Sequence, residues 1–344
     1  MTGTAAVPAL PGPGAHGGDG ARVATALGIP VGEVLDLSAS LNPCAPDPGP
    51  TVARHLDALR RYPDPARATA ALAEAMGIDR DRLLLTNGGA EAIALVGALL
   101  GGSVAEPDFS LYPRGPATST ALDPSDARTD LDHAAHRDLH PGHGNALDPS
   151  AEPPRWRSNP HSPSGVLAGA DETAGVWDEA FWALATGTWT RGDFRDGSVV
   201  VGSLTKLLAC PGLRIGYLLA PESADGDRLL AAASAAQPGW SVGGLACEAL
   251  PELLATVDLP GWRHELARLR RELVDLLAEF GRASQSADGP WVLVPEAGDL
   301  RDRLAPHGIV VRDCTSFGLP GTVRIAVPGD ADRRRLATAL GAVS

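Results

Sequence analysis

A short apolar strand that turns through two glycines into an apolar helix is the feature that most limits the possible folds. Residues 82–86 (RLLLT) have the length and composition of a buried strand, and NGGA then leads into a second apolar stretch with helical spacing at Glu91–Leu100. This order begins a pattern in which strands and helices alternate. It predicts an α/β fold in which helices flank a mainly parallel sheet.

Apolar spacing elsewhere predicts further helices and strands. Residues 65–77 and 261–280 have alanine, leucine or valine at helical spacing. Short apolar runs predict strands in six more segments: 34–43, 198–205, 214–220, 291–295, 308–312 and 323–327. The last three alternate with helical patterns, so we expect the C-terminal part of the chain to be α+β.

We expect the chain to divide into three parts. The first fifty residues are rich in proline and glycine and predict an arm (1–48) that has little regular structure and joins the small domain. We expect a large domain at 49–235, built on the mainly parallel sheet, and a smaller C-terminal domain at 236–344. Within the large domain, Ala121–Arg157 is dense in Asp, Pro and His and predicts a loop.

Charge and hydrophobicity exclude several classes of partner. The chain has 29 basic and 42 acidic residues, a net charge of −13, so we expect it to bind neither nucleic acid nor an anionic membrane surface. The longest apolar run, near 92–105, is too short and too glycine-rich to span a bilayer. The N-terminal residues lack the basic and apolar regions of a signal peptide. The cysteines form no CxxC pair and favour reduced thiols, so we expect a soluble cytoplasmic protein: Cys44, Cys210, Cys247 and Cys314.

The stretch SLTKLLACPGLRIGYL (203–218) places Lys206 among apolar residues, with a hydroxyl and a guanidinium nearby. Burial lowers the pKa of an amine and frees it to act as a nucleophile, as Schiff-base formation with a carbonyl cofactor requires. Pyridoxal phosphate is such a cofactor, and its phosphate has partners here. Ser203 can donate a hydrogen bond and Arg214 can pair in bidentate fashion. An isolated lysine of this kind would more often lie on the surface beside a strand.

With these residues the chain resembles the fold-type I pyridoxal-phosphate enzymes, and among them the threonine-phosphate decarboxylases and histidinol-phosphate aminotransferases. The resemblance covers nearly the whole chain and implies the fold-type I transferase fold, with the cofactor bound in the large domain. It rests on the order of nine stretches: AHGGDG (15–20), LDLSASLNP (35–43), RYPDP (61–65), LLTNGGAEAI (84–93), PDFSLY (107–112), NPHSPSG (159–165), WDEAF (177–181), PGWSV (238–242) and GIVVRDCTSFGLPGTVRIAV (308–327).

Several of these stretches have a physical role toward the cofactor. The glycines of TNGGAE let the backbone N–H groups of Gly89 and Ala90 approach a phosphate at the start of a helix. Asp178 follows a short apolar run and is expected at a strand end, where an ionised carboxylate can keep the pyridine nitrogen protonated. The resemblance implies that Phe109 stacks on the cofactor and that Lys206 forms the Schiff base. Lys206 and Asp178 are therefore the expected catalytic residues.

The resemblance also implies roles toward the substrate and a second subunit. Tyr62 matches a tyrosine that reaches the cofactor phosphate of the neighbouring subunit, which implies a homodimer with shared active sites. Arg324 matches an arginine whose fork holds the substrate α-carboxylate, and Arg312 matches one on the substrate's phosphate side. His16 matches a histidine near that phosphate, and Asn42 an asparagine close to the substrate. Without the resemblance, each would be expected in a turn or on an exposed strand.

Two features depart from the family pattern. The usual NPNNPTG is NPHSPSG here, so Ser162 occupies the position of an asparagine that hydrogen-bonds the phenolic oxygen of the cofactor. Serine can also donate but is shorter, so His161 or a water would have to help. The segment from Ser162 to Asp178 is also shorter than in relatives, which fit a helix and a full strand there.

Four histidines have a spacing that a metal site could use: His133, His136, His140 and His143. Pro141 and the neighbouring glycines and alanines favour flexible chain, and no cysteine joins them. We therefore expect no metal site.

The reaction depends on which bond at the substrate Cα is held perpendicular to the cofactor ring. The first hypothesis is an L-threonine O-3-phosphate decarboxylase-like enzyme that supplies aminopropanol phosphate for cobalamin biosynthesis, because AHGGDG followed by LDLSASLNP resembles the decarboxylases. The second is an aminotransferase acting on histidinol phosphate or a similar amino acid. The third is a catalytically weakened binding or regulatory member of the fold, which Ser162 and the short middle segment favour. A Rossmann dehydrogenase is disfavoured because TNGGAE lacks G-x-G-x-x-G spacing.

Overall fold

The largest element of the structure, a computed structural model that describes residues 10–116 and 151–343, is a six-stranded sheet in the order β2-β7-β6-β5-β4-β3. Its strands are β2 (Leu83–Asn87), β3 (Ser103–Val104), β4 (Arg155–Ser158), β5 (Val176–Asp178), β6 (Val199–Ser203) and β7 (Ile215–Leu219). β3, β4, β5 and β6 pair in parallel, whereas β7 is antiparallel to both of its neighbours, β6 and β2. The α/β fold with a mainly parallel sheet is confirmed.

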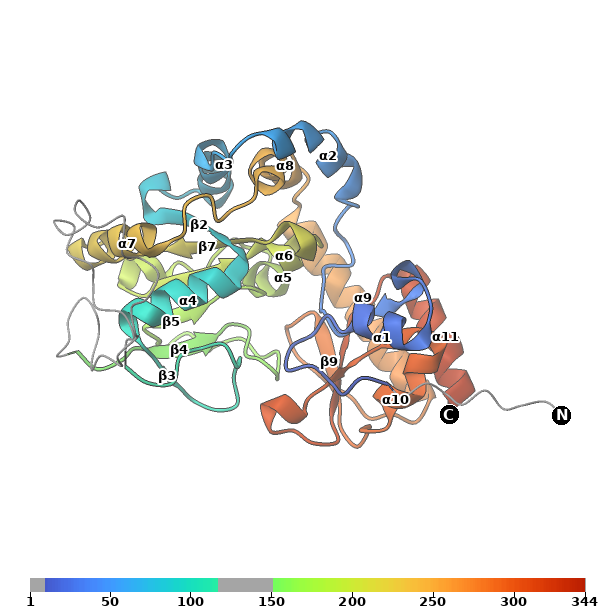
Figure 1. Cartoon of the computed structure of the whole chain (residues 1–344). Coiled ribbons are helices and arrows are strands. Elements are labelled where there is room, and N and C mark those ends of the chain that lie inside the picture. Colours follow the sequence, from blue (N-terminus) through green and yellow to red (C-terminus); the bar gives the residue numbers. More distant parts are fainter. Residues whose placement is uncertain (1–9, 117–150, 344) are drawn as a thin grey trace.

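The six-stranded sheet separates two apolar cores, because successive side chains of a strand point to opposite faces. Val199 and Val201 pack on one face with α4 (Gly88–Leu100) and α7 (Ala224–Ala236). Val200 packs on the other face, in a core that includes α3 (Ala66–Met76) and α8 (Gly244–Leu254). α3 and α8 lie together above the sheet in Figure 1, beside α2 (Gly49–Ala53). The short helices α5 (Trp182–Thr186) and α6 (Leu204–Leu207) follow β5 and β6.

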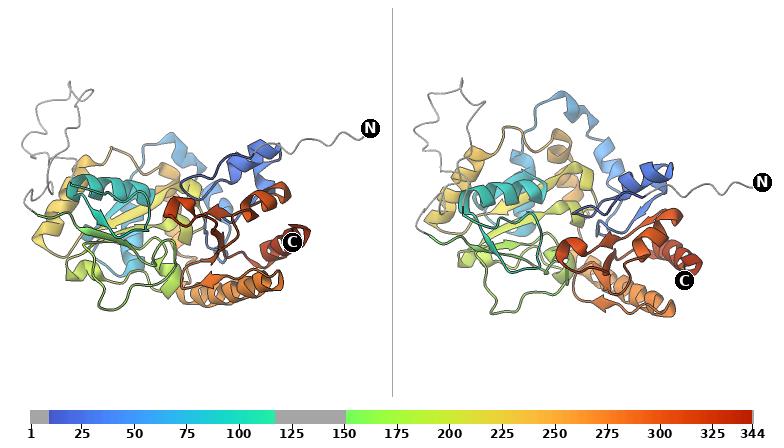
Figure 2. Two further views of the ribbon diagram at one scale, coloured as in Figure 1. Left: turned by 90° about the horizontal axis from the view of Figure 1, so that it is seen from below. Right: turned by 60° about the horizontal axis from the view of Figure 1, so that its bottom comes forward.

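A four-stranded antiparallel sheet forms a second centre, with the order β11-β12-β9-β8. Its strands are β8 (Gln285–Ser286), β9 (Trp291–Val294), β11 (Arg312–Asp313) and β12 (Val323–Ala326). Three helices accompany it: α9 (Leu259–Glu279), α10 (Leu300–Leu304) and α11 (Asp330–Val343). This small sheet and its helices lie to the right of the six-stranded sheet in Figure 1, and Figure 2 shows the same side-by-side arrangement from two other directions.

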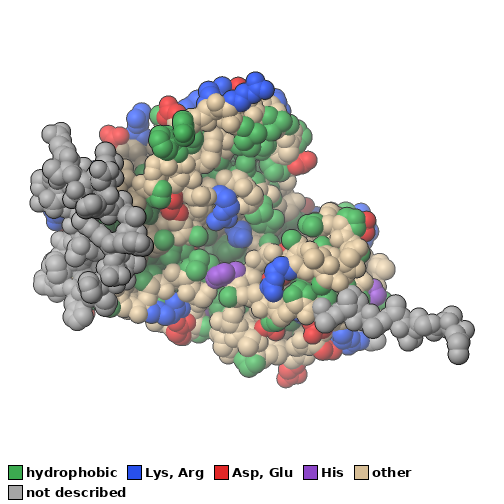
Figure 3. Space-filling view, viewed as in Figure 1, with side chains coloured by type: hydrophobic (Ala, Val, Ile, Leu, Met, Phe, Trp, Pro, Cys, Tyr) green, Lys and Arg blue, Asp and Glu red, His purple; other side chains and the backbone are tan. Residues whose placement is uncertain are grey.

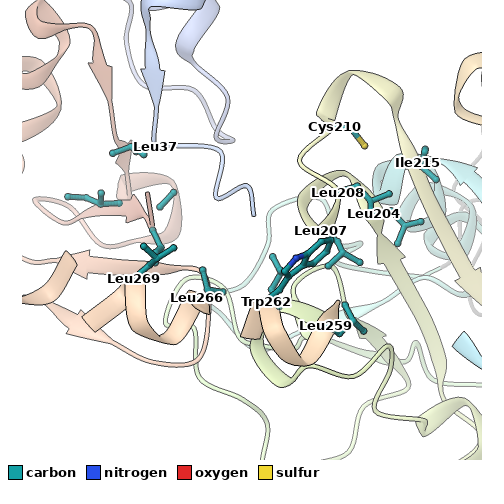
Figure 4. Close-up of a cluster of buried hydrophobic side chains, with 14 of the residues drawn as sticks. Leu37, Leu204, Leu207, Leu208, Cys210, Ile215, Leu259, Trp262, Leu266 and Leu269 are labelled. Carbon is teal, nitrogen blue, oxygen red and sulfur yellow. The ribbon is translucent and has the colours of Figure 1, made fainter. Parts of the chain in front are cut away.

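Helix α9 connects the two centres through one continuous apolar core. In Figure 4, Leu259 and Trp262 of α9 lie near Leu207 from the end of α6, while Leu266 and Leu269 lie on the side of Leu37. The leucines recur at helical spacing along α9, so one face of a single helix packs against both parts of the molecule. The two sheets are thereby held on either side of the space that contains Lys206.

The N-terminal arm has more regular structure than its composition predicted. Residues Gly20–Leu27 form helix α1, which ends at Gly28 in the left-handed conformation, and α1 buries Val23 and Ala24. The single short strand expected in 34–43 is present as β1 (Leu35–Asp36) and pairs in parallel with β10 (Ile309–Val310). The expectation of an arm with little regular structure was wrong for α1, because its apolar face packs on the C-terminal part of the chain.

Other predicted elements agree with the structure within a few residues, with three differences. α4 begins at Gly88 rather than at Glu91, so the two glycines of NGGA form its first turn. Residues 308–312 are divided between β10 and β11. The loop predicted for Ala121–Arg157 was wrong at its end, because 155–158 form β4 with Trp156 fully buried. Residues 117–150 lie outside the described residues.

Two expectations concern the chain as a whole. The domain boundaries after residues 48 and 235 stay a prediction. Among the helices that the structure describes, none combines the length and the hydrophobicity that crossing a bilayer requires.

Candidate active site

A cavity of about 320 Å³ lies where the C-terminal ends of β5 and β6, the N-terminal arm and the small sheet meet. In Figure 3, a histidine and Lys or Arg side chains (purple and blue) gather around the hollow at the centre of the view. All but two of the predicted cofactor- and substrate-binding residues line this cavity: His16, Gly89, Ala90, Phe109, Ser162, Asp178, Ser203, Lys206, Arg214, Arg312 and Arg324. A larger but more open groove of about 520 Å³, beside Trp189 and Pro260, contains none of them.

Lys206 lies in the short helix that follows β6 and is the only lysine in the sequence. Burial, together with smaller effects of the nearby guanidinium groups of Arg324, Arg214 and Arg312, lowers the pKa of its amine to about 8. No hydrogen bond to this amine is found among the residues that the structure describes. At pH 7 about a tenth of the amine is therefore uncharged, far more than for a lysine in water, and this fraction can act as a nucleophile.

The turn between β2 and α4 forms a cradle for an anion. Gly88 has a φ of +73°, and a Cβ built on it would lie 2.4 Å from Nη2 of Arg214. Gly216 lets β7 lie equally close to this turn, since a Cβ built on Gly216 would lie 2.3 Å from the carbonyl carbon of Gly88. Side chains at these two positions would therefore displace the guanidinium or the turn. The open N-terminus of α4, Arg214 and the hydroxyl of Ser203 together suit a phosphate dianion.

Asp178 lies at the end of β5, as predicted, and its two oxygens have fixed partners. Oδ1 accepts a hydrogen bond from the backbone N–H of Ala180 (2.9 Å), and Oδ2 accepts one from the hydroxyl of Tyr112 (2.8 Å). Burial raises the pKa of the Asp178 carboxyl to about 6, while these two hydrogen bonds oppose the increase. The arrangement keeps an ionised carboxylate aimed into the cavity at neutral pH.

Tyr112 and Asp108 are two site residues that sequence reasoning missed. Both belong to PDFSLY, the stretch that pointed to Phe109, but neither was singled out. Asp108 is buried and accepts hydrogen bonds from the backbone N–H of Phe109 and from both the N–H and the hydroxyl of Ser158. Ser158 Oγ then accepts from the N–H of Ser162 (2.7 Å). One carboxylate thus fixes the positions of both Phe109 and Ser162.

Arg312 and Arg324 are neighbours across β11 and β12 and are almost completely buried. The Arg324 guanidinium lies 4.6 Å from the centre of the Trp291 ring, and that of Arg312 lies 4.6 Å from the centre of the Phe317 ring. Burial, with a smaller effect of Arg312, lowers the pKa of Arg324 to about 9. Aromatic rings support these two charges without neutralising them, so both remain available to an anion.

The hydrogen bonds of the two arginines differ. Arg312 donates to the carbonyl of Ala15 (2.8 Å) and to Oγ of Ser316 (3.4 Å). Among the residues that the structure describes, Arg324 has neither a hydrogen bond nor an ion pair, and its buried Nε has no partner. Of these two buried charges, Arg324 is therefore the one with less compensation inside the protein.

His16 lies at the mouth of the cavity, with its ring 5.4 Å from that of Phe109. Burial lowers the pKa of this imidazole, and the positive charges of Arg312 and Lys206 lower it further. The residue after His16 must be glycine for steric reasons, because a Cβ on Gly17 would lie 2.0 Å from the carbonyl oxygen of Ser38. The HGG sequence therefore allows the arm to lie directly against the segment that follows β1.

Two predicted residues are not brought into the cavity. Asn42 is buried, donates to the carbonyl of Leu207 (2.9 Å) and accepts from the N–H of Cys44, so both ends of its amide are used by the backbone. Tyr62 is 79% exposed and stacks on Trp240, with ring centres 4.5 Å apart. Within the single chain, Asn42 fixes the segment after Lys206 and Tyr62 faces solvent.

His161 and the histidine-rich segment add nothing to the cavity. Both ring nitrogens of His161 are engaged, with Ser164 Oγ (2.7 Å) and the carbonyl of Pro107 (2.6 Å), so His161 does not assist Ser162. The histidines that could have suggested a metal site lie outside the described residues: His133, His136, His140 and His143. Within 10–116 and 151–343, no group of His, Cys, Asp and Glu suits a metal ion.

The residues of the cavity fit pyridoxal phosphate. The glycine cradle beside Arg214 leaves room for a phosphate group that side chains would fill, and Lys206 is a partly desolvated amine without a partner. Asp178 presents a buried carboxylate to the same space. Ser203, Arg214, Gly89 and Ala90 would hold the phosphate, and Asp178 the ring nitrogen.

Comparison with known proteins gives consistent results. The family model for aminotransferase class I and II matches residues 158–342. The chain is 31% identical to a threonine-phosphate decarboxylase from Salmonella typhimurium, over 95% of this chain and 95% of that protein. It is 29% identical to a histidinol-phosphate aminotransferase from Halorubrum lacusprofundi, over 93% of this chain and 90% of that protein.

The fold is shared with solved structures of lower sequence identity. A histidinol-phosphate aminotransferase from Sinorhizobium meliloti, in complex with pyridoxal-5′-phosphate, matches with a TM-score of 0.66 at 17% identity, over 89% of this chain and 90% of that one. The fold-type I transferase fold expected from the sequence is thereby confirmed.

Proposed function

Because the chain belongs to the aminotransferase class I and II family, we propose that it is a decarboxylase of L-threonine O-3-phosphate. The chain is an enzyme of this family, and its cofactor is pyridoxal 5′-phosphate. The proposal concerns the substrate and the reaction. It is carried by one observation, that His16 on the N-terminal arm lines the same cavity as Arg312 and Arg324. Three basic side chains suit a substrate with both a carboxylate and a phosphate.

Each part of the cavity has a task in this reaction. When bound, pyridoxal phosphate supplies an electron sink for the electrons released at the substrate Cα. Asp178 holds a proton on the cofactor's ring nitrogen, which its fixed, ionised state allows. Arg324 binds and orients the carboxylate, while Arg312 and His16 bind the phosphate. Lys206 is the base and acid of the cavity, because its pKa of about 8 permits both states near neutral pH.

In decarboxylation, the bond from Cα to the carboxylate breaks and carbon dioxide leaves. Cα then needs a proton, and the ammonium form of Lys206 can supply it. The desolvated surroundings favour this transfer, since burial makes the ammonium form a stronger acid than a lysine in water. The product is aminopropanol phosphate. We propose, from the sequence resemblance, that it enters cobalamin biosynthesis in the cytoplasm.

We also propose that two copies of the chain form a homodimer. Tyr62 and Trp240 are both largely exposed, although they stack on each other, and the side chains of Leu56 and Leu59 are exposed nearby in the sequence. A second subunit would cover this apolar surface and would bring Tyr62 to the partner's cofactor phosphate. A protein that remains monomeric with bound cofactor would contradict this part of the proposal.

An aminotransferase of the histidinol-phosphate type is the second candidate, favoured by the relatives of that name. Lys206 would then take the proton from Cα instead of returning one. Both reactions would use Lys206, Asp178 and the residues that hold the cofactor phosphate, but histidinol phosphate has no carboxylate for Arg324 to bind. The weakened, non-catalytic alternative is not proposed, because Lys206, Asp178 and Arg214 all line the cavity.

The test is to incubate the cofactor-loaded enzyme with L-threonine O-3-phosphate, with and without a 2-oxo acid. A decarboxylase releases carbon dioxide and aminopropanol phosphate without consuming the oxo acid. An aminotransferase converts the oxo acid to its amino acid and releases no carbon dioxide. Histidinol phosphate with 2-oxoglutarate is the matched assay for the second candidate. Turnover in that assay alone would replace the first proposal with the second.

A further inference from the structure

Trp291 contacts both sides of the cavity at once. It is the first residue of β9 in the small sheet and is 1% exposed. The face of its ring supports the guanidinium of Arg324 at 4.6 Å, and Phe181, which follows Asp178 closely in the chain, packs edge-on against it at 4.9 Å. Its indole Nε1–H donates to the carbonyl of Pro163 at 2.7 Å. One side chain therefore connects the small sheet with the loop that contains Ser162.

The residues just before Trp291 bind the same loop. The N–H groups of Asp288 and Gly289 both donate to the carbonyl of Gly165 at 3.0 Å. Gly289 has no space for a side chain, because a Cβ there would lie 2.9 Å from the Trp291 ring. Among the described residues, four hydrogen bonds thus hold the Ser162 loop (residues 158–168) against the segment that leads into β9, because the N–H of Leu167 also donates to Oδ2 of Asp288 (3.4 Å). Trp291 provides the only one of the four in which a side chain is the donor.

Arg324 depends on Trp291 for its position. Among the described residues it makes no hydrogen bond or ion pair, and its second aromatic neighbour, Phe317, is farther away at 5.9 Å. A cation held over a ring keeps its N–H edge free, whereas a carboxylate partner would occupy that edge. The ring therefore fixes the arginine and leaves its hydrogen-bonding capacity for the substrate.

We propose that Trp291 is a positioning residue that places Arg324 for the substrate carboxylate and fixes the Ser162 loop beside the cofactor. The proposal rests on the proposed function in one respect, the role of Arg324 as the carboxylate-binding group. The two tasks belong to different parts of the indole, so they can be separated by substitution. Trp291→Phe keeps an aromatic ring and removes the N–H, whereas Trp291→Leu removes both.

The first measurement tests the contribution of Trp291 to binding of the substrate carboxylate. The KM of the cofactor-loaded enzyme for L-threonine O-3-phosphate is compared with the inhibition constant of aminopropanol phosphate, which lacks only the carboxylate. Trp291→Leu is expected to reduce the preference for the carboxylate-bearing ligand by about three- to thirtyfold, the range of a desolvated cation–π contact. Trp291→Phe is expected to keep most of the preference. A Trp291→Leu enzyme with the full preference of the natural enzyme would overturn the proposal for Arg324.

The second measurement tests the contribution of Trp291 to holding the Ser162 loop. Hydrogen exchange of the peptide covering 158–168 is compared between the natural holoenzyme and Trp291→Phe. Because the Pro163 carbonyl loses its buried donor, local opening is expected to increase at least about fivefold. Unchanged exchange in Trp291→Phe would overturn the proposal for the loop.

Trp177→Leu is the matched control for general destabilisation. Trp177 is also 1% exposed and also supports an arginine, Arg191, at 4.8 Å, but it does not line the cavity. The Trp177→Leu variant should lower the melting temperature as Trp291→Leu does. It should leave unchanged both the preference for the carboxylate-bearing ligand and the hydrogen exchange of the peptide 158–168. If the natural enzyme itself shows no preference for the carboxylate-bearing ligand, the proposed function is wrong. The exchange measurement still tests whether Trp291 fixes the Ser162 loop.

Discussion

Two sides of the cavity differ in how their polar groups find partners. The six-stranded sheet provides the cavity floor, which consists of Asp178, Ser203 and Arg214. The small sheet provides the cavity wall, which consists of Arg312 and Arg324. Asp178 has a hydrogen-bond donor for each oxygen, and Ser203 Oγ lies 2.8 Å from Thr205 Oγ1. Arg324 rests on an aromatic ring and has no polar partner among the described residues. Asp178 and Ser203 of the floor therefore have polar partners before any ligand arrives, whereas Arg324 of the wall has none. Arg214 and Arg312 are the exceptions on each side, because the Arg214 side chain has no hydrogen bond among the described residues and Arg312 donates two.

This difference corresponds to how long each ligand stays. A cofactor that remains bound through many reaction cycles suits a floor whose groups are held in place permanently. A substrate enters and leaves in each cycle, and a wall with free charge gains its hydrogen bonds only when the substrate is present. The uncompensated charge of the wall costs stability in the empty protein and favours binding of an anion.

Lys206→Ala should have the largest effect, because this amine lies between floor and wall and both need it. Turnover should fall on the order of 10³-fold or more, since covalent and proton-transfer steps are lost together. Because Lys206 is the only lysine, borohydride should attach the cofactor to its peptide alone, as read by mass spectrometry. The cofactor should still bind the variant without a covalent link. Attachment at the N-terminal amine instead would contradict the assignment.

Asp178→Asn tests the floor. The amide can accept a hydrogen bond but cannot hold the ring-nitrogen proton by charge, so turnover should decrease about 10²- to 10⁴-fold while cofactor remains bound. Steady-state rates and the cofactor content of the purified variant measure the two effects. Glu179→Gln, a change at the adjacent buried carboxylate that does not line the cavity, is the control. A normal rate in Asp178→Asn would mean that Asp178 does not contact the cofactor.

Arg324→Met tests the wall and should separate function from stability. Binding of both threonine phosphate and threonine should weaken about ten- to a hundredfold, because both ligands have the carboxylate. The free energy of unfolding of the cofactor-free protein should increase by about 1–4 kcal/mol, because a buried charge without a polar partner is replaced by an apolar side chain. The penalty is present at pH 7, below the Arg324 pKa of about 9, where the guanidinium is charged.

Arg312→Met is the matched variant for this prediction. It should impair threonine phosphate far more than threonine, because Arg312 is assigned to the phosphate. Its gain in stability should be smaller, since Arg312 already donates hydrogen bonds to Ala15 and Ser316. Equal losses for the two substrates would show that the phosphate assignment is wrong and would favour an amino acid without phosphate.

Tyr112→Phe should change the floor by a smaller amount and in a pH-dependent way. The Tyr112 hydroxyl lowers the pKa of Asp178, so its removal should raise that pKa above the value of about 6. Noncovalent cofactor binding, which needs the ionised carboxylate, should then begin to weaken at a higher pH as the solution is acidified. Equilibrium binding in the Lys206→Ala background, between pH 5 and 8, measures the shift. An identical pH dependence with and without the hydroxyl would show that the contact has no electrostatic effect.

The floor and the fold were predictable from the sequence because they depend on local patterns. NGGA after an apolar run predicted the turn at the start of α4, and DEAF after VW predicted Asp178 at a strand end. Tyr112 was missed because its value lies in a contact with Asp178, 66 residues away in the chain. No spacing rule connects these two positions before the strands are paired.

The wall was predictable only in part. The resemblance identified Arg312 and Arg324, but not that Trp291 and Phe317 rather than carboxylates support them. Asn42 was expected close to the substrate, and the structure places it outside the cavity with its amide bonded to the backbone. The role of Tyr62 toward a neighbouring subunit stays a prediction. The arm was expected to lack structure because proline and glycine dominate its composition. Its helix α1 depends on apolar contacts with Ala305 and Val310, which composition cannot reveal.

His16→Ala should have the smallest effect, because His16 is at the edge of the wall and is exposed to solvent. Loss of one such contact should weaken threonine phosphate about two- to fivefold, since water can replace part of it. Burial and the charges of Arg312 and Lys206 lower the imidazole pKa, so at pH 7 the neutral ring acts as a hydrogen-bond donor rather than as a cation.

Binding constants for threonine phosphate and threonine at pH 6 and 8 test this assignment. The natural enzyme should gain affinity for the phosphate substrate at pH 6, where more of the imidazole is protonated, and His16→Ala should lose that gain. If the variant retains the full pH dependence, the arm only encloses the cavity, and Arg312 alone distinguishes the phosphate.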